Sequence, residues 1–338
     1  MIRILTKLLS LPTLALRFYF ASRKQKAFMK KYLEPLLLHA MIENDGSLAA
    51  SDFEKIRKYY GWAVPALLGE SFSALRGEPF TKEERHGLTY LGALTGLFDD
   101  FFDEKRLDLE HIKGLITNPD ITEPNNSHEK LFLSLYLEAL KYLDMAHVQE
   151  KFLEVLHAQV ASLEQLDQGI TVARLEEITA NKGGVSLLFY GCAFKRRLTA
   201  EEAKMIYMMG AVGQLENDIF DVYKDIKQNI NTLATQANDM DNLRSIYIDW
   251  INRVFTCATD INKGGRRLNF FLDLFFAIAC RGIVCLDFLQ HTTAKCDGAF
   301  VLKEMSRKDL VCDMESPTNI TGLIVYYVKG SQNLANIS

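Results

Sequence analysis

The sequence is poor in residues that interrupt helices and in motifs that mark common cofactor sites. It has seven prolines in 338 residues, and no segment rich in Pro, Gly or Ser divides it. Its six cysteines form no Cys-x-x-Cys pair, which leaves little support for a structural zinc site or a redox dithiol. A formal net charge of -4 gives no sign of nucleic-acid binding. We therefore expect an all-α protein that forms a single domain over 1–338, with reduced and buried cysteines.

The sequence also lacks an apolar run that is both long and uncharged. Its most apolar stretch, 270–290, contains three charged residues, so we expect a buried core helix and no integral membrane span. The N-terminus is apolar, but Pro12 and Arg17 break the pattern of a cleaved signal. We expect 1–45 to form an N-terminal helical extension with a solvated basic face over 23–31. These features predict a cytoplasmic protein.

Helical periodicity runs through most of the chain, and capping signals mark several helix starts. Thr81–Glu84 and Thr199–Glu202 have the spacing of capping boxes. Helices are therefore expected over 82–104 and from 199 to about 227. Ser51 is expected at the N-cap of an earlier helix.

One expected helix, from Leu175 to Phe194, contains the stretch Asn181-Lys-Gly-Gly184. Two glycines inside a helix cost about 1 kcal/mol each relative to alanine. The stretch therefore predicts an interruption of the helix, as a bend, a close approach to a ligand or a plain kink.

The most unusual stretch is Gly96–Glu104, where three aspartates interrupt an apolar helical pattern. Asp99, Asp100 and Asp103 are spaced by three and four, so on a helix their carboxylates point to roughly one side. Charged side chains are rarely buried unless they are paired or hold a metal, and like charges this close repel. A hard divalent cation such as Mg²⁺ relieves that repulsion, which makes all three aspartates catalytic candidates.

Gln214–Asp225 repeats this anomaly later in the chain. Asn217, Asp221 and Asp225 are spaced by four, so we expect one oxygen-bearing stripe on a long helix, with Lys224 beside it. Two such stripes on facing helices can hold several Mg²⁺ ions in a helical bundle. A diphosphate completes the metal shells and becomes a good leaving group once its charge is neutralised.

The two motifs together resemble those of class I terpene synthases, within the isoprenoid synthase superfamily that also includes trans-prenyl diphosphate synthases. The first has the DDxxD pattern at 99–103, and the second has the NDxx(S/T/D)xxK(D/E) pattern at 217–225. The text from Lys182-Gly-Gly to Gly213-Gln214 is similar to the prenyl synthase layout, so the resemblance covers roughly 85–235. It implies an isoprenoid synthase-type helical bundle around a central apolar cavity.

The resemblance implies a role for each motif residue. The metal ligands that it implies, for three Mg²⁺ ions or Mn²⁺ in their place, are Asp99, Asp103, Asn217, Asp221 and Asp225. Asp100 would orient the site or bind basic groups. The residues implied to bind the substrate diphosphate are Arg174, Lys182 and Lys224.

Departures from the family patterns bear on the reaction. No GGKRxRP-type basic motif precedes Asp99, because 69–77 holds only Arg76, so a second site for isopentenyl diphosphate is not expected. That favours cyclisation of one substrate over chain elongation. The C-terminal Arg-Tyr pair of many bacterial cyclases is missing, which leaves open the basic group that closes over the diphosphate. Asp221, where cyclases usually have Ser or Thr, leans towards prenyl synthases and head-to-head condensing enzymes.

The sequence thus predicts a Mg²⁺-dependent class I terpene synthase. It would ionise a linear prenyl diphosphate, farnesyl or geranylgeranyl, and cyclise the allylic cation to a terpene with release of diphosphate. The alternatives are a prenyl transferase, a head-to-head synthase of the squalene or phytoene type, and a non-catalytic partner subunit of a prenyl synthase. The intact second motif speaks against the last, and a homodimer is compatible with each.

Residues that flank the motifs are the candidates for lining the apolar pocket. Aromatic rings stabilise carbocations through their π faces, although each ring is more often packed in a core. The cavity candidates are Thr95, Phe98, Phe102, Phe189 and Phe220. Two other patterns carry little weight: Glu154 and His157 form one Glu-x-x-His pair where a di-iron bundle needs two, and 263–267 lacks the P-loop pattern.

Overall fold

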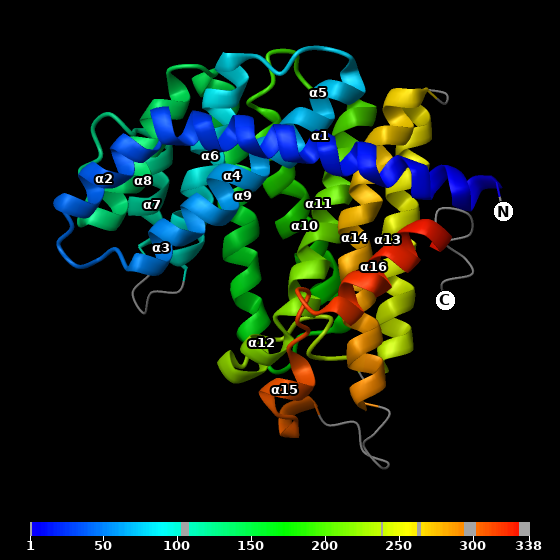
Figure 1. The fold of residues 1–338 in the computed structure, drawn as a ribbon. Helices are drawn as coiled ribbons and strands as arrows, with labels where there is room; N and C mark the ends of the chain where they lie inside the picture. The colour runs from blue at the N-terminus through cyan, green and yellow to red at the C-terminus, as the bar shows by residue number, and fades with distance from the viewer. Residues whose placement is uncertain (1, 103–107, 238, 262–264, 294–301, 331–338) are drawn as a thin grey trace. The chain divides into compact units, whose positions relative to one another are not determined.

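The chain is almost entirely helical. The computed structural model describes residues 2–102, 108–237, 239–261, 265–293 and 302–330, and all regular secondary structure in these ranges is helix, without a strand (Figure 1). This confirms the all-α prediction. The helices gather into an N-terminal unit, residues 13–159 and 189–198, and a C-terminal unit, residues 1–12, 160–188 and 199–338. The single domain expected over 1–338 stays a prediction.

The N-terminal unit is built from consecutive helices. In chain order they are α1 (Ile2–Tyr32) from residue 13 onward, α2 (Glu34–Ile42), α3 (Ala50–Lys55), η1 (Ile56–Tyr60), α4 (Gly61–Ala63), η2 (Val64–Gly69), α5 (Glu70–Arg76), α6 (Lys82–Asp100), α7 (Leu109–Thr117), α8 (Ser127–Leu140) and α9 (Met145–Ser162) up to residue 159. The π-helical turns η1 and η2 join the α-helical pieces without a loop, so α3 to α5 form one irregular helical run.

Helix α6 is the central helix of this unit. Its first turn has the predicted capping box: the Glu84 N–H donates to Thr81 Oγ1 at 3.2 Å, and the Thr81 N–H donates to Glu84 Oε2 at 2.9 Å. From Glu84 to Phe98 nearly every residue is buried, because α6 packs on α8 and on the α3–α5 run. The helix ends at Asp100, before the expected end at residue 104.

Packed aromatic rings fill the core beside α6. The centroid of the Phe98 ring lies 4.8 Å from that of Phe152, and the Phe189 centroid lies 4.6 Å from that of Phe152 on another side. Phe98 and Phe189 are only 2% and 3% exposed. Both were candidates for lining a cavity, and both are part of this packed core.

The first turn of the α3–α5 run corrects one predicted cap. Ala49, and not Ser51, occupies the N-cap position of α3, and its N–H donates to Asp52 Oδ2 at 2.9 Å. Asp52 lies at the third helical position, where a carboxylate satisfies the free N–H and is favoured by the helix dipole. Helix α3 therefore begins at Ala50, two residues before the start that an N-cap at Ser51 predicts.

The C-terminal unit begins with the first residues of α1 and continues in the second half of the chain. Its other elements are the end of α9, η3 (Leu163–Leu166), α10 (Val172–Gly191) up to residue 188, α11 (Ala200–Phe220), α12 (Val222–Gln228), α13 (Met240–Ile261), α14 (Arg266–Thr293), η4 (Leu302–Glu304), α15 (Arg307–Leu310) and α16 (Pro317–Gly330). Lys7 pairs with Asp273 on α14, and Ser10 Oγ lies 3.3 Å from Tyr327 Oη on α16.

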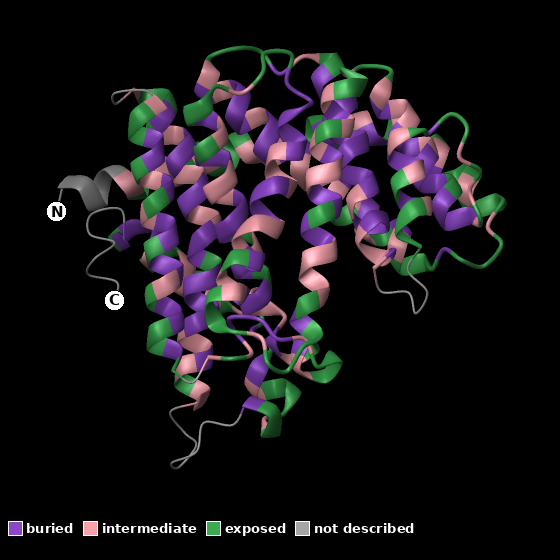
Figure 2. Ribbon diagram, turned by 180° about the vertical axis from the view of Figure 1, so that it is seen from behind, coloured by how far each residue is buried: buried purple, intermediate pink, exposed green. Residues whose placement is uncertain are grey.

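Helix α11 is the central helix of the C-terminal unit. It packs on α13 and α14, which also contact each other, and α16 packs on α14. The second predicted capping box is confirmed, because the Glu202 N–H donates to Thr199 Oγ1 at 3.3 Å and the Thr199 N–H donates to Glu202 Oε2 at 2.9 Å. Buried positions recur along the sides of these helices that meet other helices, as Figure 2 shows.

The backbones of α10 and α11 cross almost in contact. A Cβ atom built on Gly183 would lie 2.1 Å from the Gly210 carbonyl oxygen, and one built on Gly210 would lie 2.2 Å from the Gly183 carbonyl oxygen. Helix α10 nevertheless continues unbroken from Val172 to Gly191, so the interruption expected at 181–184 is wrong. The glycines permit a close approach to another helix.

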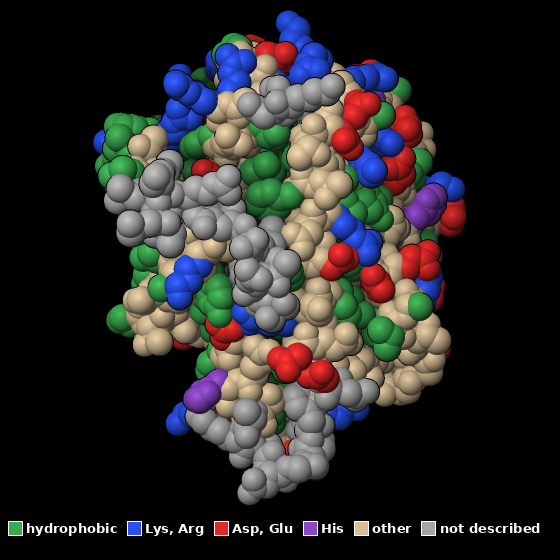
Figure 3. All heavy atoms as spheres, turned by 90° about the vertical axis from the view of Figure 1, so that its right-hand side faces the viewer, with side chains coloured by type: hydrophobic (Ala, Val, Ile, Leu, Met, Phe, Trp, Pro, Cys, Tyr) green, Lys and Arg blue, Asp and Glu red, His purple; other side chains and the backbone are tan. Residues whose placement is uncertain are grey.

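Two further expectations can be compared with the described residues. The cysteines among them are free and buried, as expected: Cys192, Cys257, Cys280, Cys285 and Cys312, while Cys296 lies outside the described residues. No helix in the described ranges is long and apolar enough to cross a membrane. On the face drawn in Figure 3, acidic and basic side chains are interspersed with apolar ones.

The helix crossing generates a stability prediction with a matched control on the same helix. Gly210→Ala forces the two backbones apart, so we expect a loss of about 3 kcal/mol in the free energy of unfolding. Gly213→Ala, one turn later, meets no atom within 4 Å. There we expect a gain of about 0.5–1 kcal/mol, because alanine is the better helix former.

Urea denaturation followed by circular dichroism measures both changes. Equal stabilities for the two alanine variants would contradict the close crossing.

Candidate functional site

Asp99 lies in the last turn of α6 and is half-buried. Gln159 of α9 donates a short hydrogen bond from Nε2 to Asp99 Oδ1. Gln159 is only 4% exposed, so an amide donor is held in the core of the N-terminal unit against this carboxylate. Asp103, the third aspartate of the first motif, lies outside the described residues.

Asp100, although adjacent in sequence, faces another set of partners. Lys55 of α3 lies with Nζ 3.1 Å from Oδ1 and 3.3 Å from Oδ2 of Asp100. His128 of α8 lies with Nε2 4.0 Å from Oδ2. The first motif therefore splits between two sides of α6, with Asp99 towards an amide and Asp100 towards basic groups.

One side of α6 near Asp99 has a polar contact above the aromatic core. Thr95, one turn earlier, lies with Oγ1 2.7 Å from Tyr190 Oη. Burial raises the pKa of Tyr190, and the charge of Asp99 adds to this. Phe102 is half-buried, with its ring centroid 5.4 Å from that of Phe98. Thr95, Asp99 and Phe102 are therefore partly accessible, as is Asp100 at the same end of the helix.

The second motif lies at the end of α11, in the C-terminal unit. Helix α11 ends at Phe220, and Asp221 adopts φ −92° and ψ 9° before α12 begins. The backbone hydrogen bonds persist through this bend: the Asp221 N–H donates to the Asn217 carbonyl and the Asp225 N–H donates to the Asp221 carbonyl, each at 2.9 Å. The expectation of one uninterrupted helix to about residue 227 is therefore wrong. The oxygen-bearing side chains follow a bent path from exposed Asn217 through half-buried Asp221 to buried Asp225.

Asp225 is the most unusual carboxylate of this motif. It is 7% exposed, and no group in the described part of the chain hydrogen-bonds to its side chain. Burial raises its pKa to about 7, and the charges of Asp218 and Asp221 add to this, while Lys224 and Lys182 act in the opposite direction. Burial and the neighbouring carboxylates both disfavour the charged form of Asp225, so this group is one that a cation stabilises.

Asp218, buried beside it, is satisfied by hydrogen bonds instead. Gln214 Nε2 donates to Oδ1 at 2.9 Å, and Thr179 Oγ1 of α10 donates to Oδ2 at 3.1 Å. Burial still raises the pKa of Asp218 to about 6. Because Thr179 comes from α10, Asp218 ties the two closely crossing helices together next to the motif.

The three basic candidates for diphosphate binding differ in their surroundings. Lys224 is exposed, with Nζ 3.7 Å from Asp221 Oδ2. Lys182, on α10 next to Gly183, is close enough for its charge to lower the pKa of both Asp218 and Asp225. Both lysines thus lie at the second motif, and their binding of a diphosphate stays a prediction.

Arg174, the remaining candidate, is engaged elsewhere. Its guanidinium contacts both carboxylate oxygens of Glu164 at 2.7 and 2.9 Å and that of Glu177 at 2.7 Å. Any anion that it bound would have to replace these two carboxylates.

An open side of α11 adjoins the motif. Gly213 is exposed, and a Cβ atom built on it would have no atom within 4 Å. Asn217 follows one turn later. The guanidinium of Arg281, on α14, lies over the Phe220 ring at 5.2 Å and 3.7 Å from Glu216 Oε1. Its side chain is about half exposed, which adds a basic group beside the open helix side that the sequence left unassigned.

Several of these partners were missed from the sequence. Gln159 and Thr179 are polar residues on otherwise apolar helix sides, which is the signal that singles them out once helical periodicity is applied. Lys55 carries no such signal, because it belongs to an ordinary charged segment. Tyr190 follows the cavity candidate Phe189 in the sequence, but its contact with Thr95 depends on the tertiary fold.

The donor set of the second motif suits a hard divalent cation. The Asn217 amide and the Asp221 and Asp225 carboxylates supply oxygen ligands of the kind that Mg²⁺ prefers. In the ranges that the structure describes, no three His, Cys, Asp or Glu side chains already form a metal cluster. The fit therefore rests on the chemistry of the donors and on the raised pKa of the buried Asp225 carboxylate.

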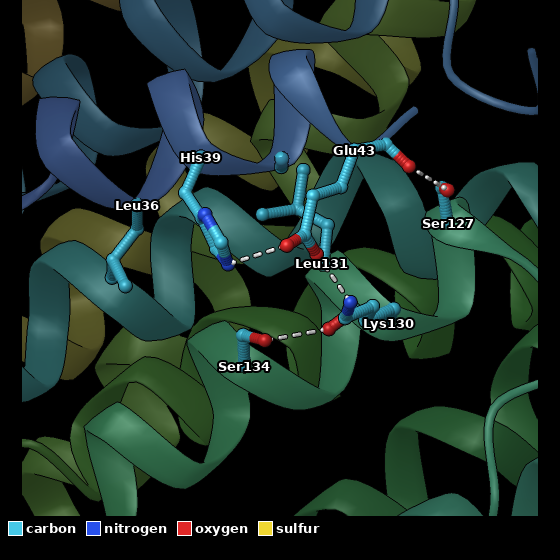
Figure 4. A pocket seen from close by; sticks show the side chains of 8 residues that line it. Leu36, His39, Glu43, Ser127, Lys130, Leu131 and Ser134 are labelled. Atoms are coloured by element: carbon cyan, nitrogen blue, oxygen red, sulfur yellow. Dashed lines mark hydrogen bonds and ion pairs between the residues drawn. The ribbon is translucent and has the colours of Figure 1, made fainter. Parts of the chain in front are cut away.

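A shallow pocket in the N-terminal unit lies apart from these residues. It is lined by α2 and α8, with a cavity volume of about 40 Å³ (Figure 4). Its polar groups satisfy one another: His39 and Lys130 pair with Glu43, and Ser134 Oγ donates to the Lys130 carbonyl at 2.7 Å. Ligand pockets have volumes of about 300–1,000 Å³, so this one is too small for a prenyl diphosphate.

A scan of protein-family models, a search of curated proteins and a search of solved structures each gave no match to this chain.

Glu216 provides a pH-dependent test of the inner side of α11. Burial raises its pKa to about 7 from an ordinary value of 4.5, with the charge of Arg281 and the nearby Tyr247 hydroxyl acting against burial. Because the folded-state pKa is the higher one, protonated Glu216 contributes stability that is fully present below pH 4.5 and is lost as the pH rises through 7. Glu216→Gln removes this loss of stability at high pH, because the glutamine side chain does not ionise.

We therefore expect the stability advantage of Glu216→Gln over wild type to grow by about 2 kcal/mol between about pH 5 and pH 8. Denaturant unfolding at both pH values measures it, with the exposed Glu304→Gln as control. A pH-independent difference for Glu216→Gln would rule out a buried, protonated carboxyl.

Proposed function

We propose that this protein is a class I terpene synthase, which ionises a linear prenyl diphosphate with Mg²⁺ and cyclises the resulting cation. The observation that supports it most is the buried Asp225 carboxylate, which lies near the charges of Asp218 and Asp221 and follows Asn217 and Asp221 at helical spacing. These residues have the types and spacing of a diphosphate-linked metal motif, and their charge calls for a cation. The fold that belongs to this proposal is an isoprenoid synthase-type bundle, and the location is the cytoplasm.

On this proposal, Asn217, Asp221 and Asp225 hold one Mg²⁺ ion, and Asp99 and Asp103 hold the others. Bound Mg²⁺ supplies the positive charge that stabilises diphosphate as it leaves. The hydrogen bond from Gln159 fixes the orientation of Asp99, and the pair with Lys55 holds Asp100 towards α3. Asp100 then acts as a positioning residue through Lys55.

The basic residues near the second motif would bind the diphosphate itself. Lys224 and Lys182 already lie beside the carboxylates, so each can exchange an aspartate contact for a phosphate oxygen when metal neutralises the aspartates. Arg281 is the group we assign to the side of Gly213 and Asn217, because its guanidinium is held over Phe220 and remains half exposed. Because the Arg281 guanidinium is held in place, it would stabilise the negatively charged diphosphate that leaves more than the neutral hydrocarbon product.

Incubation with Mg²⁺ and geranyl, farnesyl or geranylgeranyl diphosphate tests the activity directly. We expect hydrocarbon or alcohol products from a single prenyl diphosphate, detected by mass spectrometry. Asn217→Ala and Asp225→Asn should each lower the rate on the order of 100-fold, the scale of losing one charge-stabilising group. Asp249→Asn, an exposed aspartate on α13, serves as the matched control and should retain activity.

The same assay separates the alternatives. Turnover only when two prenyl diphosphates, or one plus an acceptor, are supplied would identify a transferase or a head-to-head synthase. Absence of product with all three substrates would refute the cyclase. Diphosphate release that survives Asp99→Ala combined with Asn217→Ala would overturn both kinds of enzyme.

Metal binding gives a prediction that does not depend on turnover. Mg²⁺ at about a hundred times its Kd should raise the free energy of unfolding of wild type by about 2.7 kcal/mol. Asp225→Asn should be more stable than wild type without metal, because a buried charge is gone, and should gain little from Mg²⁺. Thermal unfolding with and without Mg²⁺ measures both effects, and an equal response of the two proteins would exclude Asp225 as a ligand.

A further inference from the structure

The part of α1 that belongs to the N-terminal unit, residues 13–32, packs through one side only. Ser22 Oγ accepts a hydrogen bond from Trp62 Nε1 at 3.0 Å. Buried Gln25 donates from Nε2 to the Gly61 carbonyl at 2.8 Å, and Met29 is 8% exposed. These positions recur at three and four, so they define one inner stripe of the helix.

The opposite stripe faces outward and is apolar in its first half. Leu16 and Phe20 lie one turn apart and are 56% and 58% exposed, with Tyr19 beside them at 52%. Large apolar side chains this exposed are common singly on proteins, but three on consecutive turns of one helix form a patch.

The second half of the same outward stripe is basic. Between Thr13 and Tyr32 the chain has six basic residues and no acidic one, although the whole protein has a net charge of -4. The basic residues are Arg17, Arg23, Lys24, Lys26, Lys30 and Lys31, and all are exposed. One of them is paired with an acidic side chain, because Glu70 Oε1 lies 3.5 Å from Lys24 Nζ.

The positive field at this end of the helix acts on a neighbouring phenol. The ammonium groups of Lys82 and Lys31 each lie 5.2 Å from the Tyr32 ring centroid, and they lower the pKa of Tyr32. The local excess of positive charge therefore extends from α1 to the start of α6.

We infer that residues 13–32 of α1 form a membrane-surface helix that binds bilayers with anionic head groups. A bilayer surface offers an apolar layer for Leu16, Tyr19 and Phe20 next to negative head groups for the basic residues. A helix lying in that interface buries its apolar side chains and places its Lys and Arg among the head groups. This replaces the merely solvated basic face expected from the sequence at 23–31.

Charge favours an anionic bilayer over a second copy of this chain as the partner of the outward stripe. A second copy would bring the same six positive charges against this stripe, and like charges across an interface repel. An anionic bilayer instead supplies opposite charge over an extended plane, which matches a stripe that runs along the helix axis.

The inference is independent of the proposed reaction, because it uses no residue of either acidic motif. The two fit together in one respect: prenyl chains and terpenes are apolar, so an enzyme at a bilayer surface would be next to the phase in which they dissolve.

Flotation of the full chain with two kinds of vesicle tests the inference. One kind is phosphatidylcholine alone, and the other contains phosphatidylserine as well. We expect binding to the anionic vesicles and little to the neutral ones, with binding that weakens as salt is added. Leu16→Ser combined with Phe20→Ser should lower the partition coefficient by about tenfold, because two apolar anchors are lost.

Arg23→Gln combined with Lys30→Gln should lower partitioning by about tenfold or more and should reduce its salt dependence. The matched controls are Ile121→Ser, 79% exposed in a loop of the same unit, and the exposed Lys113→Gln. Both controls should bind like wild type, and circular dichroism should show equal helix content in all variants.

Two results would overturn the inference. One is absence of binding to anionic vesicles, or binding that the α1 variants and the controls share equally. The other is a dimer in vesicle-free buffer that Leu16→Ser with Phe20→Ser dissociates, since that would assign the stripe to a second copy of the chain.

Discussion

The C-terminal unit depends on the contact between Gly183 and Gly210. Backbones that meet without side chains between them fix the rotation of both helices about the contact, because neither can turn without a clash. That rotation places Thr179 against Asp218 and brings Lys182 to the carboxylates at the end of α11. A backbone contact thus determines which polar groups meet at the motif, and the hydrogen bond from Thr179 follows from it.

The motif that results is unbalanced in charge. Asp218 is satisfied by two neutral donors, whereas Asp225 is buried with no donor in the described part of the chain. A helix end does not require such a group, because a neutral side chain of the same size would cost less free energy to bury. The imbalance therefore favours a ligand of positive charge, and the open side of α11 at Gly213 lies one helical turn before Asn217.

Local signals in the sequence predicted more of the structure than tertiary ones. The capping boxes at Thr81 and Thr199 depend on residues three apart, so the sequence was sufficient. The partners of the first motif come from other helices: Lys55 is 45 residues from Asp100, and Gln159 is 60 residues from Asp99. Helical periodicity does not link such pairs. The glycine pair of α10 was interpreted as an interruption of the helix, because Gly210, which faces Gly183, lies on another helix. Burial of Asp225 likewise depends on packing that spacing alone does not specify.

The C-terminal unit contains both the first residues of the chain and its last helix, which affects how the protein folds during synthesis. Lys7 and Asp273 are 266 residues apart, and Ser10 and Tyr327 are 317 apart, yet both pairs lie in this unit. The unit cannot complete its core on the ribosome until α16 has emerged, whereas every residue of the N-terminal unit has been made once residue 198 is added. Contacts this distant in sequence are slow to form, and the apolar sides of α11, α13 and α14 remain uncovered in the meantime. Nascent chains of this protein are therefore a natural substrate for chaperones that shield apolar helices.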